Sequence, residues 1–78
     1  MSDIRNQVLD VISEALNVEK GVLSDDLSIG GIPEWDSVGN LAIISAIEEK
    51  MEIEIPLDDL FDLTSITALV EEVEKLKA

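Results

Sequence analysis

Apolar residues recur at helical spacing along part of the chain, and this pattern predicts where its helices lie. The first apolar stripe predicts a helix over residues 3–16, with Ser2 and Asp3 as residue types suited to its N-cap. Periodicity then fails over residues 17–36, where several glycines and Pro33 predict a long loop. The apolar residues of this loop indicate that it packs on the core; they are Leu23, Leu27, Ile29, Ile32 and Trp35.

A second helical pattern starts at Asp36 and Ser37, two residue types that cap helices, and should end near Met51 or Glu52. Its apolar positions are Val38, Leu41, Ile44, Ile47 and Met51. Gly39 lies in the first turn, where glycine costs up to about 1 kcal/mol relative to alanine. Its presence therefore needs an explanation other than helix propensity.

The last part of the chain predicts an extended connector, a short helix and a final helix. Residues 52–56 alternate as a strand would, but no partner strand is evident, so we expect a connector. Pro56 can open a short helix over residues 57–61, and Thr64 or Ser65 should cap the last helix. The expected fold class is all-α: a small four-helix bundle with three longer helices, one short helix and a long loop between the first two. The whole chain, residues 1–78, is expected to form one domain.

Composition and charge exclude several functions. Five Lys and Arg face eighteen Asp and Glu, giving a net charge of −13, and the chain has no Cys or His. Nucleic acids and anionic membranes would repel it, and zinc sites, thiol nucleophiles and histidine-based triads are ruled out. A hydrophobic content of 46% predicts a folded chain. Without a signal peptide or an apolar membrane span, we expect a cytoplasmic protein, and we expect it to act as a monomer.

Ser37 opens an uncharged stretch, residues 37–47, that lies between Glu34 and Asp36 on one side and Glu48 and Glu49 on the other. A serine at a helix start lies where free backbone N–H groups and the helix dipole favour a bound or attached phosphate. The alternative interpretation is that its hydroxyl only caps the helix.

The run Glu34-Trp35-Asp36-Ser37-Val38 resembles the modification site of acyl and peptidyl carrier proteins. The later run Ile-Glu-Glu-Lys-Met-Glu-Ile-Glu-Ile-Pro at the family's spacing extends the resemblance over nearly the whole chain. The resemblance implies a non-catalytic carrier whose Ser37 receives 4′-phosphopantetheine from coenzyme A. The partners that it implies are a phosphopantetheinyl transferase, an acyl or aminoacyl ligase or acyltransferase, and downstream synthase enzymes. Asp36 would contact a metal ion during the modification.

The resemblance also implies further binding residues. Family members can shelter an acyl chain between the second, third and fourth helices. Matching apolar positions, all of them also expected core residues, are Val38, Leu41, Ile44, Ile47, Ile55, Leu60, Leu63 and Ile66. Fatty-acid carriers typically place acids two and five positions after the serine, where this chain has Gly39 and Ala42. The residues that we expect to contact partner enzymes are therefore partly uncharged and partly acidic: Trp35, Asn40, Ala42, Glu48 and Glu49.

Trp35 and the run Gly39-Asn40-Leu41 look more like discrete carriers of specialised pathways. The expected cargo is an acyl or aminoacyl thioester of a specialised fatty-acid, polyketide, nonribosomal peptide or lipid pathway. A second function class is an acidic interaction protein that binds a basic partner surface without covalent chemistry. A third is calcium binding, although the acidic clusters lack the spacing of an EF-hand loop.

Overall fold

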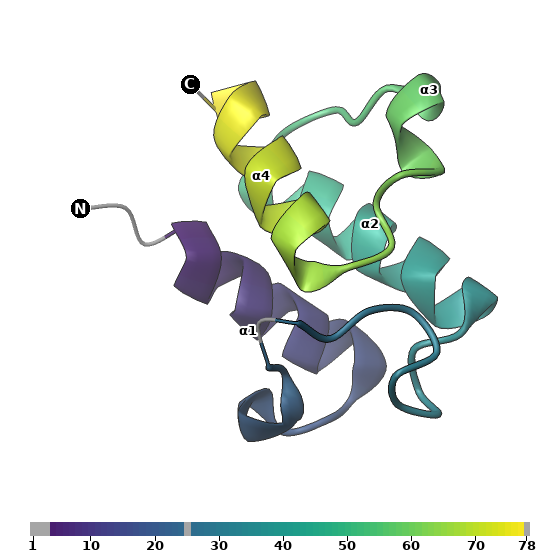
Figure 1. Cartoon of the computed structure of the whole chain (residues 1–78). Helices are drawn as coiled ribbons and strands as arrows, with labels where there is room; N and C mark the ends of the chain where they lie inside the picture. The colour runs from purple at the N-terminus through teal and green to yellow at the C-terminus, as the bar shows by residue number, and fades with distance from the viewer. Residues whose placement is uncertain (1–3, 25, 78) are drawn as a thin grey trace.

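The computed structural model describes residues 4–24 and 26–77, and within these ranges the chain forms helices joined by loops (Figure 1). The helices are α1 (Ile4–Leu16), α2 (Ser37–Met51), α3 (Leu57–Leu60) and α4 (Ile66–Lys77), with a short 3₁₀ helix, η1 (Lys20–Val22), in the first loop. The expected small all-α bundle with three longer helices and one short helix is confirmed. The predicted caps of the first helix, Ser2 and Asp3, lie outside the described residues.

The hydrophobic core lies between the three longer helices, because α1 packs against both α2 and α4. Each of these helices contributes fully buried aliphatic side chains, which include Val8, Ile12, Ile43, Ile47, Leu69 and Val73. The single-turn helix α3 lies at the edge of the bundle, on the side opposite α1 (Figure 1). None of the described helices is long and apolar enough to cross a membrane.

The long loop between α1 and α2 is attached to the segment that leads into α4. The Ile29 N–H donates to the Thr64 carbonyl at 2.7 Å, and the Ile66 N–H donates to the Leu27 carbonyl at 3.2 Å. An isolated antiparallel bridge pairs Ser28 with Ser65. The apolar loop residues named above are buried or half-buried against the core, as the sequence predicts.

The helix ends follow local rules. Glu52 has a left-handed backbone conformation, with φ 57° and ψ 49°, and its N–H donates to the Glu48 carbonyl, which ends α2 at Met51. Pro56 precedes α3 as expected. The Ser65 hydroxyl accepts a hydrogen bond from the Ala68 N–H at 3.1 Å, so Ser65 rather than Thr64 caps α4.

Candidate functional site

Ser37 is the first residue of α2, and its side chain is exposed. Its hydroxyl forms no hydrogen bond with any residue in the described ranges. The N-terminal end of a long helix carries free N–H groups and the positive end of the helix dipole. An anionic group joined to the Ser37 oxygen would therefore lie in a favourable field.

Asp36 performs the capping role at this helix start, which leaves the Ser37 hydroxyl free for other chemistry. The Asp36 backbone is extended, and its Oδ1 accepts a hydrogen bond from the Gly39 N–H at 2.8 Å. The side chain of Asp36 is exposed. A carboxylate has acceptor capacity at both oxygens, so the cap leaves the second oxygen available for an external partner.

Gly39 allows the loop to approach α2 closely. A Cβ atom on Gly39 would lie 2.4 Å from the backbone oxygen of Glu34 and 3.1 Å from a methyl group of Leu16. Side chains do not approach backbone atoms this closely, so only glycine fits without a shift. The need for this approach explains the glycine that helix propensity alone disfavours.

Trp35 and Asn40 form a buried polar pair directly beneath the helix start. The Trp35 side chain is fully buried, and its Nε1–H donates to Asn40 Oδ1 at 2.9 Å. Asn40 is only 8% exposed. Both residues were predicted to contact partners, but burial keeps Trp35 away from any docking enzyme and leaves Asn40 almost no outer surface. We therefore correct that prediction: the pair supports the site from inside.

A largely apolar pocket of about 640 Å³ opens beside Ser37. Helix α2 supplies one wall, α3 and its C-terminal neighbour Phe61 supply the opposite wall, and the loops contribute the rest. The lining residues are Ile29, Ser37, Asn40, Leu41, Ile44, Leu57, Leu60, Phe61 and Thr64. A flexible group attached to the Ser37 oxygen can therefore reach this apolar pocket directly, because Ser37 is part of its lining.

The pocket brings together some of the predicted lining residues and not others. Leu41, Ile44 and Leu60 line it. Val38 is 75% exposed and lies outside the lining. The remaining predicted residues are part of the buried core; they are Ile47, Ile55, Leu63 and Ile66. Sequence reasoning missed Leu57 and Phe61 beside Leu60, and it missed the loop contributors Ile29 and Thr64, since these two meet the pocket only through contacts between distant segments.

The other predicted docking residues differ in their surroundings. Ala42 and Glu49 are exposed on α2. Glu48 is half-buried, and its Oε2 accepts a hydrogen bond from the Ile55 N–H at 2.9 Å. Glu48 therefore holds the connector between α2 and α3 in place, whereas Glu49 is free to face a partner.

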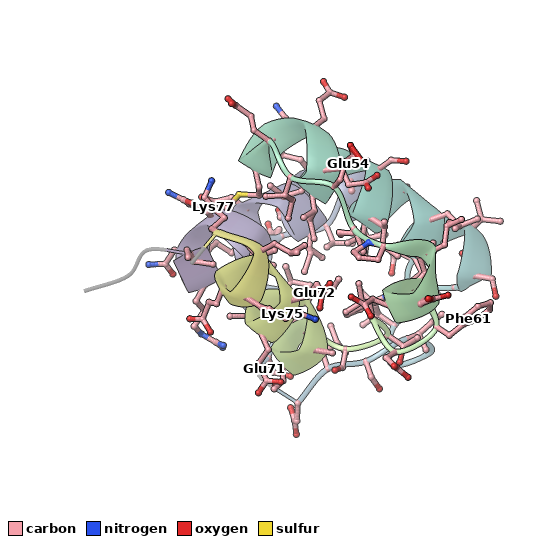
Figure 2. All side chains as sticks on the ribbon, turned by 90° about the horizontal axis from the view of Figure 1, so that it is seen from above. Glu54, Phe61, Glu71, Glu72, Lys75 and Lys77 are labelled. Carbon is pink, nitrogen blue, oxygen red and sulfur yellow. The ribbon has the colours of Figure 1, made fainter. Side chains whose placement is uncertain are left out.

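A cluster of one lysine and two carboxylates joins α3 to α4. Lys75 Nζ lies 3.6 Å from Asp59 Oδ2 and 3.8 Å from Glu72 Oε1, while Glu72 Oε2 is buried without a hydrogen-bond partner. Figure 2 shows Glu72 and Lys75 close together on α4, with Phe61 on the outer side of α3. Burial raises the pKa of Glu72 above its ordinary value of 4.5, and the Asp59 carboxyl raises it further, while Lys75 acts in the opposite direction.

Acidic residues are not gathered into a metal centre in the described part of the chain: no group of three or more of them is placed to hold an ion. The chain also has no histidine that could act as a base for Ser37. A serine without an adjacent base is a weak nucleophile. An exposed serine beside an apolar pocket therefore favours a protein that is modified to carry a group.

Comparison with known proteins identifies this class more closely. Residues 6–73 match the family described as the phosphopantetheine attachment site, so the chain belongs to that family. The fold is similar to the solution structure of a holo acyl carrier protein from Geobacter metallireducens. The TM-score is 0.84 at 21% sequence identity, and the match covers 97% of this chain and 87% of that one.

Family membership establishes a non-catalytic carrier whose prosthetic group is 4′-phosphopantetheine, as the sequence predicts. Proteins of this kind interact with a phosphopantetheinyl transferase and with pathway enzymes. The residues fit such a group: Ser37 offers an exposed hydroxyl, the start of α2 favours a phosphate, and the adjacent pocket suits an extended chain. The thiol that the prosthetic group supplies forms thioesters, which a chain without cysteine cannot do alone.

Proposed function

We propose that this protein carries acyl or aminoacyl intermediates as thioesters on a 4′-phosphopantetheine arm attached to Ser37, within a domain of residues 1–78. The observation that carries the proposal is the placement of the exposed Ser37 hydroxyl at the start of α2, on the lining of the apolar pocket. The match over residues 6–73 supports it by including this position.

The modification is a phosphoryl transfer in which Ser37 is the nucleophile. Its oxygen attacks the coenzyme A phosphorus that bears the pantetheine, and a new P–O bond forms. The bond between this phosphorus and the bridging oxygen of the pyrophosphate breaks, and adenosine 3′,5′-bisphosphate leaves on that oxygen with the bonding electrons. The hydroxyl proton passes to a base on the transferase. Asp36 would help to hold a Mg²⁺ ion at that interface, because its cap uses only Oδ1 and leaves the other carboxylate oxygen available.

The proposed setting is the cytoplasm, in a specialised fatty-acid, polyketide, nonribosomal peptide or lipid pathway. Its loading partner is an acyl or aminoacyl ligase or acyltransferase, and synthase enzymes consume the cargo. Uncharged Gly39 and Ala42 after the serine support a specialised carrier, because they leave this part of α2 without the acids that would contact a basic patch.

The test is modification of the purified protein with coenzyme A, Mg²⁺ and a broad-specificity transferase, followed by intact-mass and peptide spectrometry. We expect one phosphopantetheine to be added at Ser37, and none in Ser37→Ala. Because Asp36 is the cap, Ser37→Ala should melt close to the wild type, whereas Asp36→Asn should keep the cap and slow the modification. No mass gain, or a gain on another serine, would refute the proposal.

A further inference from the structure

The orientation of the Asn40 side chain is fixed by Trp35. An indole N–H can only donate a hydrogen bond, so the atom of Asn40 that it contacts at 2.9 Å must be the amide oxygen. The amide nitrogen, Nδ2, then lies on the other side of the side chain with two hydrogens to donate. The loop holds Trp35 itself in place, because Trp35 is fully buried and its carbonyl accepts from the Gly30 N–H at 2.7 Å.

The Nδ2 donors of Asn40 have no partner among the described residues. Unpaired donors that are fully enclosed are costly, and natural proteins avoid them. Nδ2 is not fully enclosed, since the one buried and unpaired side-chain atom in the described ranges is Glu72 Oε2. Asn40 is nevertheless 92% buried and lines the apolar pocket. The accessible face of its amide is therefore the face toward the pocket.

Asn40 lies three residues after Ser37 on α2, so both side chains belong to the same helix face. Both line the pocket, and Ile44 and Leu60 are among the apolar residues that share its lining. A group carried on Ser37 that turns into the pocket therefore enters a space that the Asn40 side chain shares with these apolar residues.

From this arrangement we propose that Asn40 is a specificity-determining residue: its Nδ2 donates a hydrogen bond to a carbonyl oxygen of the group carried on Ser37. Trp35 is the positioning residue that directs the amide toward the pocket. The inference rests on the proposed attachment at Ser37. It predicts a preference for occupants with a carbonyl near the attachment end and an apolar tail beyond it, because the apolar wall offers no partner for a polar tail.

The carbonyl can come from an amide of the prosthetic arm or from the thioester of its cargo, and two loaded forms distinguish these sources. The protein is labelled with ¹⁵N and ¹³C and compared by NMR in three forms: unmodified, carrying phosphopantetheine, and carrying hexanoyl-phosphopantetheine. Intact mass verifies each form. We expect the Asn40 side-chain amide signals to move downfield and exchange more slowly. If the Asn40 signals already change when the protein carries phosphopantetheine alone, the carbonyl belongs to the prosthetic arm. If they change only in the hexanoyl form, the carbonyl belongs to the thioester of the cargo.

The spectrum contains its own controls. The other two asparagines, Asn6 and Asn17, are exposed and line no part of the pocket, so their side-chain signals should stay in place. Signals of the Ile44 and Leu60 methyl groups report whether the pocket is entered at all.

A variant gives a second readout. Asn40→Asp keeps an oxygen for the Trp35 indole but removes the amide donors. The chain has no cysteine, so the thiol of the arm is the only thiol in the modified protein. We expect this thiol to react severalfold faster with an alkylating reagent in Asn40→Asp than in the wild type. The exposed control Asn6→Asp makes the same chemical change and should react at the wild-type rate.

The outcomes separate the two proposals. If mass spectrometry shows no modification of Ser37, the proposed function fails, and this inference fails with it. If Ser37 is modified but the Asn40 amide does not change in either loaded form, the inference alone is overturned, whether or not the pocket methyl signals move. The wild-type spectra give this answer even if Asn40→Asp does not fold.

Discussion

At the residue scale, Gly39 shows how closely the start of α2 packs against its surroundings. The missing side chain lets the Glu34 carbonyl and the Leu16 side chain approach the first turn of α2. The same turn holds the Asp36 cap and presents Ser37. Glycine at this position therefore contributes to the placement of Ser37, the proposed attachment residue.

We predict that Gly39→Ala destabilises the protein, although alanine is the better helix former. The helix gain is at most about 1 kcal/mol. The contact with a backbone oxygen at 2.4 Å cannot be relieved by a side-chain rotation, and such overpacking typically costs about 1 to 3 kcal/mol. The melting temperature, followed by circular dichroism, should fall by several degrees, since 1 kcal/mol corresponds to roughly 4 to 8 °C in a domain of this size.

Gly21→Ala is the matched control, because no heavy atom lies within 4 Å of a Cβ placed there. Its melting temperature should be unchanged or slightly higher, since alanine reduces the entropy of the unfolded chain. Equal melting temperatures for the two variants would contradict the packing argument.

Sequence reasoning identified Asp36 and Ser37 correctly as the start of a helix, because a cap followed by apolar periodicity is a local signal. It could not assign Trp35 correctly. Nothing in the neighbouring residues shows that the loop folds over this side chain, or that Asn40 accepts its hydrogen bond from within the helix. An aromatic residue beside a modification site looks like a docking contact until its burial is known.

At the element scale, α3 has no fully buried residue and is joined to α4 by charged groups. Asp59 on α3 faces Glu72 and Lys75 on α4, and these are the charged groups that surround the buried Glu72 carboxyl. Leu57, Leu60 and Phe61 of the same short segment line the pocket. The ionisation of Glu72 therefore acts on the element that forms one wall of the site.

We predict that Glu72→Gln stabilises the protein at neutral pH. The pKa of Glu72 is raised in the folded state, so folding favours its protonated form. This contribution is fully present below the ordinary pKa of 4.5 and is lost as the pH rises through the raised value. A glutamine amide can donate a hydrogen bond toward Asp59 at every pH, as only the protonated form of the acid can. The gain in melting temperature should therefore be a few degrees at neutral pH and vanish near pH 4.5.

The matched control is Glu71→Gln, which makes the same change in net charge at an exposed neighbouring position of α4. It accounts for the general relief of repulsion in an acidic protein. The informative quantity is the difference between the two variants across the pH range. Parallel pH profiles would show that the buried carboxyl has no special role.

Helices α1 and α4 could be predicted from the sequence because each has an apolar stripe that packs against its neighbours. Helix α2 is apolar on more than one side, so its bounds were predicted but its buried side was not: Val38 and Leu41, expected in the core, are exposed. The position of α3 and of the first loop could not be predicted. They depend on hydrogen bonds between distant segments, such as Ile29 with Thr64 and Ile66 with Leu27. The composition of the pocket depends on the same pairings, and the candidates taken from the family resemblance included only Leu41, Ile44 and Leu60 of its lining.

At the scale of the whole molecule, charge and apolar surface are distributed differently around Ser37. Residues 48–74 contain ten of the eighteen acids and one cation, Lys50, whereas residues 37–47 have no charge. Large apolar side chains are exposed on both sides of the pocket: Val38, Leu41, Leu57 and Phe61, the last of which is 88% exposed. A partner enzyme should therefore meet an apolar surface beside the serine and an acidic surface beyond it.

This distribution predicts that different substitutions affect different steps of docking with the transferase. Glu49→Gln removes an exposed charge from the acidic part of α2 and should slow association, by a factor that shrinks as salt screens the attraction. Glu48 is unsuitable for this test, because its carboxylate holds the Ile55 N–H and its loss would disturb the connector. Glu14→Gln on α1 is the matched control and should leave the association rate nearly unchanged.

Ala42→Asp adds a charge where the surface of α2 is uncharged, and a partner that contacts this surface must then bury an unpaired carboxylate. The complex should dissociate faster at every salt concentration, because the added cost is local desolvation and not long-range repulsion. Stopped-flow measurement of both rate constants against salt separates the two effects. If Glu49→Gln changed only dissociation and Ala42→Asp changed only association, the acidic surface would be the contact and the apolar surface would not.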